Sequence, residues 1–184
     1  MSDGLTTKTA QRIISKLIKL EDNAEKTILL ITLQKYRLGE HLKRACMNLG
    51  FNEKNIYVYT VGEVYEFDFD YIYCSEGNTF ELLAHMKENG LIALAQKQFL
   101  KGNCTYIGAS AGAMIAGKDV KFALEFDKNS VGLTDLSGLA LFDGTIIPHF
   151  TKAQLKRFLA LTDDEEMHKY DKIYSVANGR ALVL

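Results

Sequence analysis

The sequence predicts an α/β protein in which helices cover both faces of a mostly parallel sheet. Two observations support this prediction. Short apolar runs rich in β-branched residues, typical of strands buried on both faces, recur along the 184 residues. Segments with apolar residues at helical spacing separate these runs, and this alternation is typical of βαβ units. The length, without a linker or an internal repeat, favours one domain over residues 1–184.

The expected elements follow one another in a regular order. Strands are expected at the short apolar runs, residues 27–33, 55–61, 70–74, 104–109, 145–150 and 172–177. Helices are expected where apolar residues recur at helical spacing, after Thr6 or Thr7, over residues 38–49, after Asn78 or Thr79, over residues 91–101, briefly after residue 110 and over residues 152–162. The final strand continues through an Asn-Gly pair into RALVL, which predicts a hairpin with an antiparallel element at one side of the sheet.

Composition excludes several classes of function. A formal net charge of −1 gives no basic surface for nucleic acid or anionic membrane. No apolar run approaches the roughly 20 residues that span a bilayer, and the first residues lack the apolar core of a signal peptide. Three widely separated cysteines fit reduced, buried thiols, and the four histidines make no metal-ligand spacing with them. We therefore expect a cytoplasmic protein that binds no metal, membrane or nucleic acid.

Residues 106–117, YIGASAGAMIAG, place Ser110 among small residues between a predicted strand and a predicted helix. A serine hydroxyl is a weak nucleophile at neutral pH, so it must be exposed to substrate and must contact a base. A G-x-S-x-G turn from strand to helix exposes the hydroxyl, and side chains at Gly108 or Gly112 would collide with the adjoining elements. The helix that begins at Ala111 directs backbone N–H groups toward an oxyanion. Ser110 is therefore the predicted nucleophile.

His149 is the best candidate for the base. It follows a predicted strand, and ligands of parallel sheets bind beyond such strand ends, where Ser110 is also expected. Pro148 restricts the backbone just before it. The other histidines lie on charged or helical segments, at His41, His85 and His168. Three acids follow the predicted helix that begins at Ala111, namely Asp119, Glu125 and Asp127. The residues alone do not rank them.

Three ordered motifs resemble the peptidase E family of serine peptidases, which includes aspartyl dipeptidases and the related cyanophycinases. The motifs are CSEGNTFELL at 74–83, YIGASAGAMIAG at 106–117 and GLALFDGTIIPHF at 138–150. The resemblance implies a flavodoxin-like, class I glutamine-amidotransferase-like three-layer sandwich with a Ser-His-acid triad. Ser110 matches the family nucleophile and His149 its base. Glu125, fifteen positions after the serine, falls where the dipeptidases carry an aspartate, with Asp127 and Asp119 as alternatives.

The resemblance also implies an oxyanion hole and a substrate pocket. One backbone donor would be Ala111, and the other would come from Glu76 or Gly77. Glu76 replaces a glycine usual in the family. A positive φ there would cost roughly 1 kcal/mol or more, and its carboxylate would oppose an oxyanion unless it points away. Asn78 and Thr79 are expected to contact substrate.

Two further departures from the family concern the ends of the chain. The segment MSDGLTT lacks the short apolar strand that usually precedes this region. The segment VANGRALVL has Asn178 and Gly179 near a turn where an acidic residue is often found.

We therefore predict a serine peptidase that cleaves short peptides through an acyl-enzyme, without a metal or organic cofactor, as a monomer or homodimer. A family preference for an acidic residue before the scissile bond would require a cation such as Arg157, Lys152 or Lys156, although the helical pattern there favours a solvated face. The alternative is a catalytically impaired member that serves as a binding or regulatory module. An esterase of the α/β-hydrolase type is less well supported, since only 39 positions separate Ser110 from His149.

Overall fold

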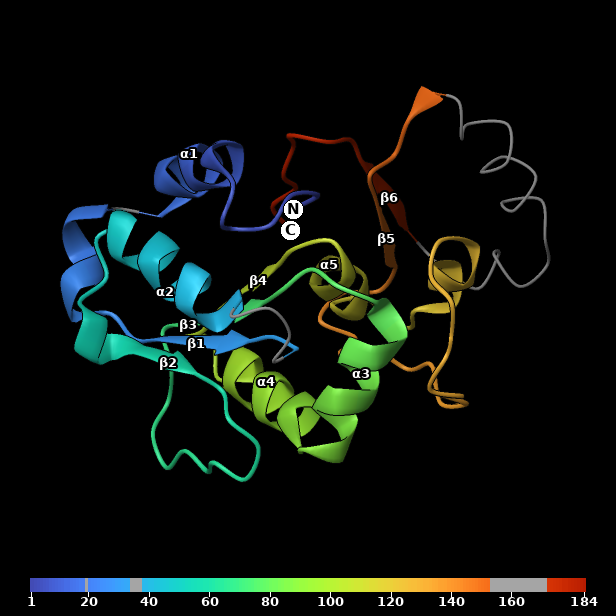
Figure 1. Cartoon of the computed structure of the whole chain (residues 1–184), viewed down its shortest axis with the longest axis horizontal. Coiled ribbons are helices and arrows are strands. Elements are labelled where there is room, and N and C mark those ends of the chain that lie inside the picture. Colours follow the sequence, from blue (N-terminus) through green and yellow to red (C-terminus); the bar gives the residue numbers. More distant parts are fainter. Residues whose placement is uncertain (19, 34–37, 153–171) are drawn as a thin grey trace.

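The computed structural model describes residues 1–18, 20–33, 38–152 and 172–184. Its centre is a four-stranded parallel sheet with the strand order β2-β1-β3-β4 (Figure 1). Its strands are β1 (Ile28–Ile31), β2 (Ile56–Val58), β3 (Tyr71–Cys74) and β4 (Thr105–Gly108). A second sheet pairs β5 (Thr145–Pro148) in parallel with β6 (Ile173–Val176). The predicted α/β class with parallel strands is confirmed.

Helices cover both faces of the four-stranded sheet. The helices α1 (Lys8–Leu17) and α2 (Leu38–Asn48) lie on one face, and α3 (Thr79–Glu88) and α4 (Leu91–Leu100) lie on the other (Figure 1). Successive β1 residues alternate between these layers. Ile28 and Leu30 join a buried cluster with residues of α2, whereas Leu29 and Ile31 join one with residues of α3. Because both faces are covered, the strand is a continuous apolar run.

The short helix α5 (Ala111–Ile115) follows β4 and contacts both sheets. Its Ala113 packs in a small buried cluster with Ile146 of β5 and Val176 of β6. Three 3-10 helices complete the described elements, η1 (Leu20–Glu25), η2 (Glu53–Asn55) and η3 (Lys121–Glu125). The helix α5 is therefore the element that packs the second sheet against the first.

Two predicted helix starts are present. The Thr7 hydroxyl accepts a hydrogen bond from the Ala10 N–H at the start of α1. The Asn78 side chain accepts from the N–H groups of Phe80 and Glu81 at the start of α3. These bonds satisfy N–H groups that have no partner within their own helix.

The predicted hairpin at the end of the chain is wrong. The strand β6 pairs in parallel with β5, and residues 181–184 form no strand. A hairpin turn of type I′ requires a positive φ at both central residues. Gly179 has a φ of 70°, but Asn178 is not among the residues with positive φ. The N–H of Arg180 instead donates to the Ala177 carbonyl over 3.2 Å, which closes a turn without a returning strand.

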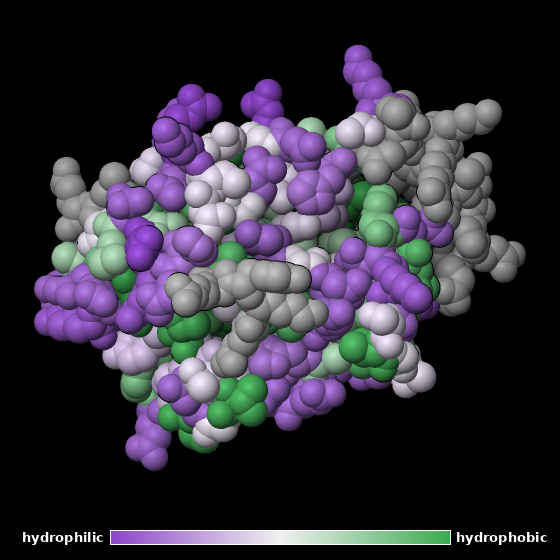
Figure 2. Space-filling model, in the orientation of Figure 1, coloured by the Kyte–Doolittle hydropathy of each residue, from purple (hydrophilic) through white to green (hydrophobic). Residues whose placement is uncertain are grey.

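The surface in the view of Figure 2 is mainly hydrophilic, with apolar side chains in small separate areas. In the described parts of the chain, no helix combines the length and apolarity that a membrane span requires. The same residues contain no group of three or more His, Cys, Asp or Glu side chains that could hold a metal ion.

Candidate active site

Ser110 lies in the tight turn between β4 and α5. Its backbone has a φ of 47° and a ψ of −108°, a strained conformation for a residue with a side chain. A Cβ on Gly108 would lie 2.5 Å from the Gly112 carbonyl oxygen, and a Cβ on Gly112 would lie 2.2 Å from that of Cys74. The glycines therefore allow β4, α5 and β3 to meet closely enough to form the turn. This is the strand-turn-helix context that the sequence predicts for a nucleophilic serine.

His149 follows the last residue of β5, and its Nε2 lies 2.8 Å from the Ser110 Oγ. Its φ of 57° departs from the extended backbone of the strand. The sheet contact resumes one residue later, where the N–H of Phe150 donates to the Val176 carbonyl over 3.1 Å. The serine and the histidine that the sequence singles out are thus brought to hydrogen-bond distance.

Asn178 contacts the other nitrogen of this imidazole, with its Oδ1 2.7 Å from the Nδ1 of His149. An amide oxygen accepts hydrogen bonds and does not donate, so the Nδ1 carries the proton. The Nε2 is then free to accept the proton of the Ser110 hydroxyl, which is the tautomer that a general base requires. The three side chains form a Ser-His-Asn chain of hydrogen bonds.

Asn178 takes the position that the sequence analysis assigned to Glu125, with Asp127 and Asp119 as alternatives. Glu125 ends η3, whereas Asp127 accepts hydrogen bonds from the Thr79 N–H over 2.8 Å and the Thr79 hydroxyl over 2.6 Å. Asp119 accepts from the Lys121 N–H over 3.0 Å. Asn178, and not one of these acids, contacts His149 because β5 and β6 pair in parallel. This pairing places the residues that follow these two strands side by side, and Asn178 lies two positions after the end of β6.

One signal in the sequence could have found Asn178. It stands near the turn where the resemblance leads us to expect an acidic residue, and asparagine keeps a side-chain oxygen at that place. The predicted hairpin adds an antiparallel element at one side of the sheet, and it gives no reason to connect this turn with His149.

The loop between β3 and α3 lies against the turn that carries Ser110. The N–H of Gly112 donates to the Ser75 carbonyl over 3.0 Å. The N–H groups of Glu76, Gly77 and Ala111 make no hydrogen bond with the parts of the chain that the structure describes. Gly77 has a φ of 145°, whereas Glu76 is not among the positive-φ residues. The strain considered for Glu76 is therefore absent, since Gly77 supplies the unusual backbone conformation.

The Glu76 carboxylate faces the N-terminal segment. Its Oε2 accepts a hydrogen bond from the Tyr73 hydroxyl over 3.1 Å, and a Cβ on Gly4 would lie 2.1 Å from its Oε1. The same hydroxyl accepts from the Leu5 N–H over 3.0 Å. Burial, and then the charge of Glu76, raise the pKa of Tyr73 well above its ordinary value, so this hydroxyl stays protonated and can donate.

Asn78 and Thr79, which we expect to contact substrate, make structural hydrogen bonds here. The Asn78 Nδ2 donates to the Lys128 carbonyl over 3.0 Å, and Thr79 binds Asp127 as described above. These bonds hold the segment after η3 against the start of α3. Arg157 and Lys156 lie outside the described residues.

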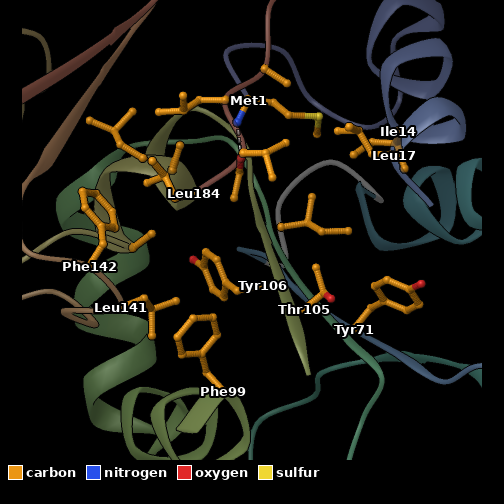
Figure 3. Close-up of a pocket in the computed structure, with 18 of the residues that line it drawn as sticks. Met1, Ile14, Leu17, Tyr71, Phe99, Thr105, Tyr106, Leu141, Phe142 and Leu184 are labelled. Carbon is orange, nitrogen blue, oxygen red and sulfur yellow. Dashed lines mark hydrogen bonds between the residues drawn. The ribbon is translucent and has the colours of Figure 1, made fainter. Parts of the chain in front are cut away.

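A cavity of about 600 Å³ lies beside β4, with a mainly apolar lining (Figure 3). Met1, Tyr106 and Leu184 are among the residues that line it. Neither Ser110 nor His149 contributes to that lining. The cavity is therefore distinct from the serine and histidine pair.

A serine at a strand-turn-helix corner of a parallel sheet, with an imidazole on its hydroxyl, defines the nucleophile-elbow class of α/β site. The family model for peptidase family S51 matches residues 2–184, so the chain belongs to this family.

Curated relatives carry peptidase names. The chain is 32% identical over 117 residues to the uncharacterized peptidase Lmo0363 of Listeria monocytogenes, an alignment that covers 62% of this chain and 56% of the relative. It is 39% identical over 80 residues to peptidase E of Salmonella typhi, which covers 42% of this chain and 32% of that protein. The alignments thus span about half or less of these relatives' length.

A solved structure from Listeria monocytogenes EGD-e, described as a candidate peptidase E protein, has the same fold. Its TM-score is 0.68 at 22% identity, over 96% of this chain and 88% of that chain.

Proposed function

We propose that the chain is a serine peptidase that hydrolyses short peptides through an acyl-enzyme. The observation that carries this proposal is the 2.8 Å contact between the Ser110 Oγ and the His149 Nε2. The contact at the other imidazole nitrogen, from Asn178, supports it because it sets the tautomer of a base. Membership of family S51 and the peptidase names of the relatives support a peptide as the substrate.

The mechanism follows from these contacts. As the Ser110 Oγ attacks the carbonyl carbon of the scissile bond, its proton moves to the His149 Nε2. The N–H groups of Ala111 and of Gly77 or Glu76 stabilise the oxyanion. The imidazolium then gives its proton to the leaving amine, and an ester links the acyl group to Ser110. Water attacks this ester with His149 as base, which releases the acid and restores the serine.

The neutral third member has a chemical consequence. The Asn178 amide orients His149 through its oxygen, but it carries no net charge to stabilise the imidazolium that forms during acylation. We expect a slower acylation than a carboxylate at the same place would give.

The finer specificity is also a proposal. A preference for an acidic residue before the scissile bond would require a nearby cation, and Lys152 is three positions after His149 in the described part of the chain. Hydrolysis rates of short peptides with aspartate at that position, compared with matched asparagine peptides, test it. Equal rates eliminate the preference.

A second candidate function is a catalytically impaired module that binds peptide without turnover. The neutral Asn178 in place of a carboxylate is the observation that favours it. Both candidates share the scaffold and differ in whether Ser110 reacts.

Labelling with a fluorophosphonate probe decides between them. We expect phosphonylation of Ser110, located by peptide mass spectrometry, and cleavage of short peptides. Ser110→Ala should abolish both and keep the thermal unfolding midpoint within a few degrees. Ser130→Ala is the matched control, because Ser130 is an exposed serine. Undiminished hydrolysis by Ser110→Ala would remove Ser110 from the mechanism, and an unaltered protein that is neither labelled nor able to cleave any peptide would favour the impaired module.

A further inference from the structure

We propose that Asp3 is a positioning residue for the Ser-His-Asn chain. Its carboxylate fixes the turn that carries Asn178 and thereby keeps the Asn178 amide on His149. The inference rests on the proposed function and deepens it. It starts from residues 1–5, which we call the N-terminal strap, because they bind both sheets.

One set of hydrogen bonds joins the strap to the first sheet. The N–H of Ser110 donates to the Met1 carbonyl over 2.9 Å. The N–H of Leu5 donates to the Tyr73 hydroxyl over 3.0 Å, and the Leu5 side chain is buried. The strap is thus bonded at one end to the turn that carries Ser110 and at the other end to Tyr73 of β3.

A second set joins the strap to the turn that follows β6. The N–H of Gly179 donates to the Asp3 Oδ2 over 3.0 Å, and the N–H of buried Ser2 donates to the Arg180 carbonyl over 3.3 Å. Two consecutive strap residues therefore hold the two residues that follow Asn178.

The bond from Gly179 is the one that bears on catalysis. The Gly179 nitrogen belongs to the planar peptide unit that begins at the Asn178 Cα. Fixing this N–H therefore fixes the peptide plane from which the Asn178 side chain extends. A carboxylate acceptor makes the bond stronger than one between neutral groups.

The site needs this restraint because Asn178 is exposed. Within the turn itself, the backbone bond from Arg180 to Ala177 is long, at 3.2 Å. Neighbouring side chains do not enclose an exposed amide, so its orientation depends on how firmly its backbone is held. Asp3 restrains this backbone through its bond to the Gly179 N–H, although it lies 175 positions before Asn178 in the chain. The strap that carries Asp3 is itself bonded to Ser110.

The test compares Asp3→Ala with Asp3→Asn. The alanine removes the acceptor, whereas the asparagine keeps an oxygen for the Gly179 N–H. We expect Asp3→Ala to lower the rate of fluorophosphonate labelling about tenfold and Asp3→Asn to restore most of it. Asp68→Ala is the control, since the Asp68 carboxylate binds the exposed Lys101 instead, and it should leave the rate unchanged.

A double-mutant cycle separates positioning from a general loss of structure. If Asp3 acts through Asn178, then Asp3→Ala should have no further effect in an Asn178→Ala background. Additive losses in the double variant would overturn the proposal. An unchanged labelling rate in Asp3→Ala, with Ser110 still labelled in the unaltered protein, would also overturn it and would leave the proposed function intact.

Proton NMR of the His149 Nδ1–H gives a measurement that does not depend on reaction. Its downfield signal should broaden or vanish in Asp3→Ala and in Asn178→Ala, and it should persist in Asp3→Asn. A persistent signal in Asp3→Ala would contradict the role of Asp3 even if no serine reacts. Failure of Ser110 to react, with the NMR changes as expected, would contradict the proposed function alone.

Discussion

The Ser110 Oγ and the His149 Nε2 lie 2.8 Å apart although two different sheets carry them. The distance therefore depends on how the sheets pack. The helix α5 contacts β5, and the N–H of Lys118 donates to the Gly144 carbonyl over 2.9 Å just before that strand. A Cβ on Gly117 would lie 2.8 Å from the same carbonyl oxygen. The site is thus assembled by long-range contacts around α5.

Replacing Asn178 tests its role in the Ser-His-Asn chain of hydrogen bonds. Asn178→Asp places a carboxylate of the same length on the His149 Nδ1, so it should stabilise the imidazolium and raise the labelling rate about tenfold at neutral pH. Asn178→Ala should lower the rate about tenfold. A rate for Asn178→Ala within twofold of the unaltered protein would contradict the assignment.

Replacing Glu76 tests whether its carboxylate opposes the oxyanion. Because this carboxylate binds the Tyr73 hydroxyl, Glu76→Gln should change the labelling rate by less than twofold. Glu76→Ala leaves the buried hydroxyl without its acceptor and should lower the free energy of unfolding by about 1 kcal/mol. Urea denaturation and labelling measure the two effects. A several-fold faster reaction in Glu76→Gln would show that the charge does act on the oxyanion.

The elbow glycines test the close approach of β3 to α5. Gly112→Ala would bring a Cβ to 2.2 Å from the Cys74 carbonyl oxygen, and we expect a loss of about 3 kcal/mol in the free energy of unfolding. Gly102→Ala is the control, because it has open space around it and a φ of 78°. It should cost only about 1 kcal/mol, from backbone strain. Similar losses in denaturant melts of the two variants would be inconsistent with a steric cause at Gly112.

The sequence was sufficient for features with a local physical cause. Strand and helix periodicity predicts the elements around β1 and α3, and the small residues near Ser110 predict the tight turn. The place of His149 follows from its position after an apolar strand.

Features that depend on long-range pairing could not be predicted in this way. The Asn-Gly pair at 178–179 has the composition of a hairpin turn, but β6 pairs with β5 and no strand returns after the turn. The strap at residues 1–5 has no periodicity that would place it between two sheets. Asn178 and Asp3 were missed as site residues for this reason.

The Asp70 carboxylate should make the stability of the folded protein depend on pH. Its carboxylate accepts hydrogen bonds from the Lys26 Nζ over 2.7 Å and from the Thr27 N–H over 2.8 Å, which ties the start of β1 to the start of β3. Burial alone would raise the pKa of Asp70, but the hydrogen bonds from Lys26 and Thr27 outweigh it and lower that pKa.

Because the folded-state pKa of Asp70 is lowered, its stabilising effect is present above the unfolded-state pKa of about 3.9 and is lost as the pH falls through the folded-state value. Solvent screening of this partly exposed group limits the effect to about 1 kcal/mol. Asp70→Asn should therefore unfold more easily than the unaltered protein at pH 7, by about that amount. The difference should shrink below pH 4 in urea melts. Asp68→Asn, which alters the exposed pair with Lys101, should change stability by less than about 0.5 kcal/mol. A difference for Asp70→Asn that stays constant between pH 7 and pH 3 would show that the carboxylate charge does not contribute.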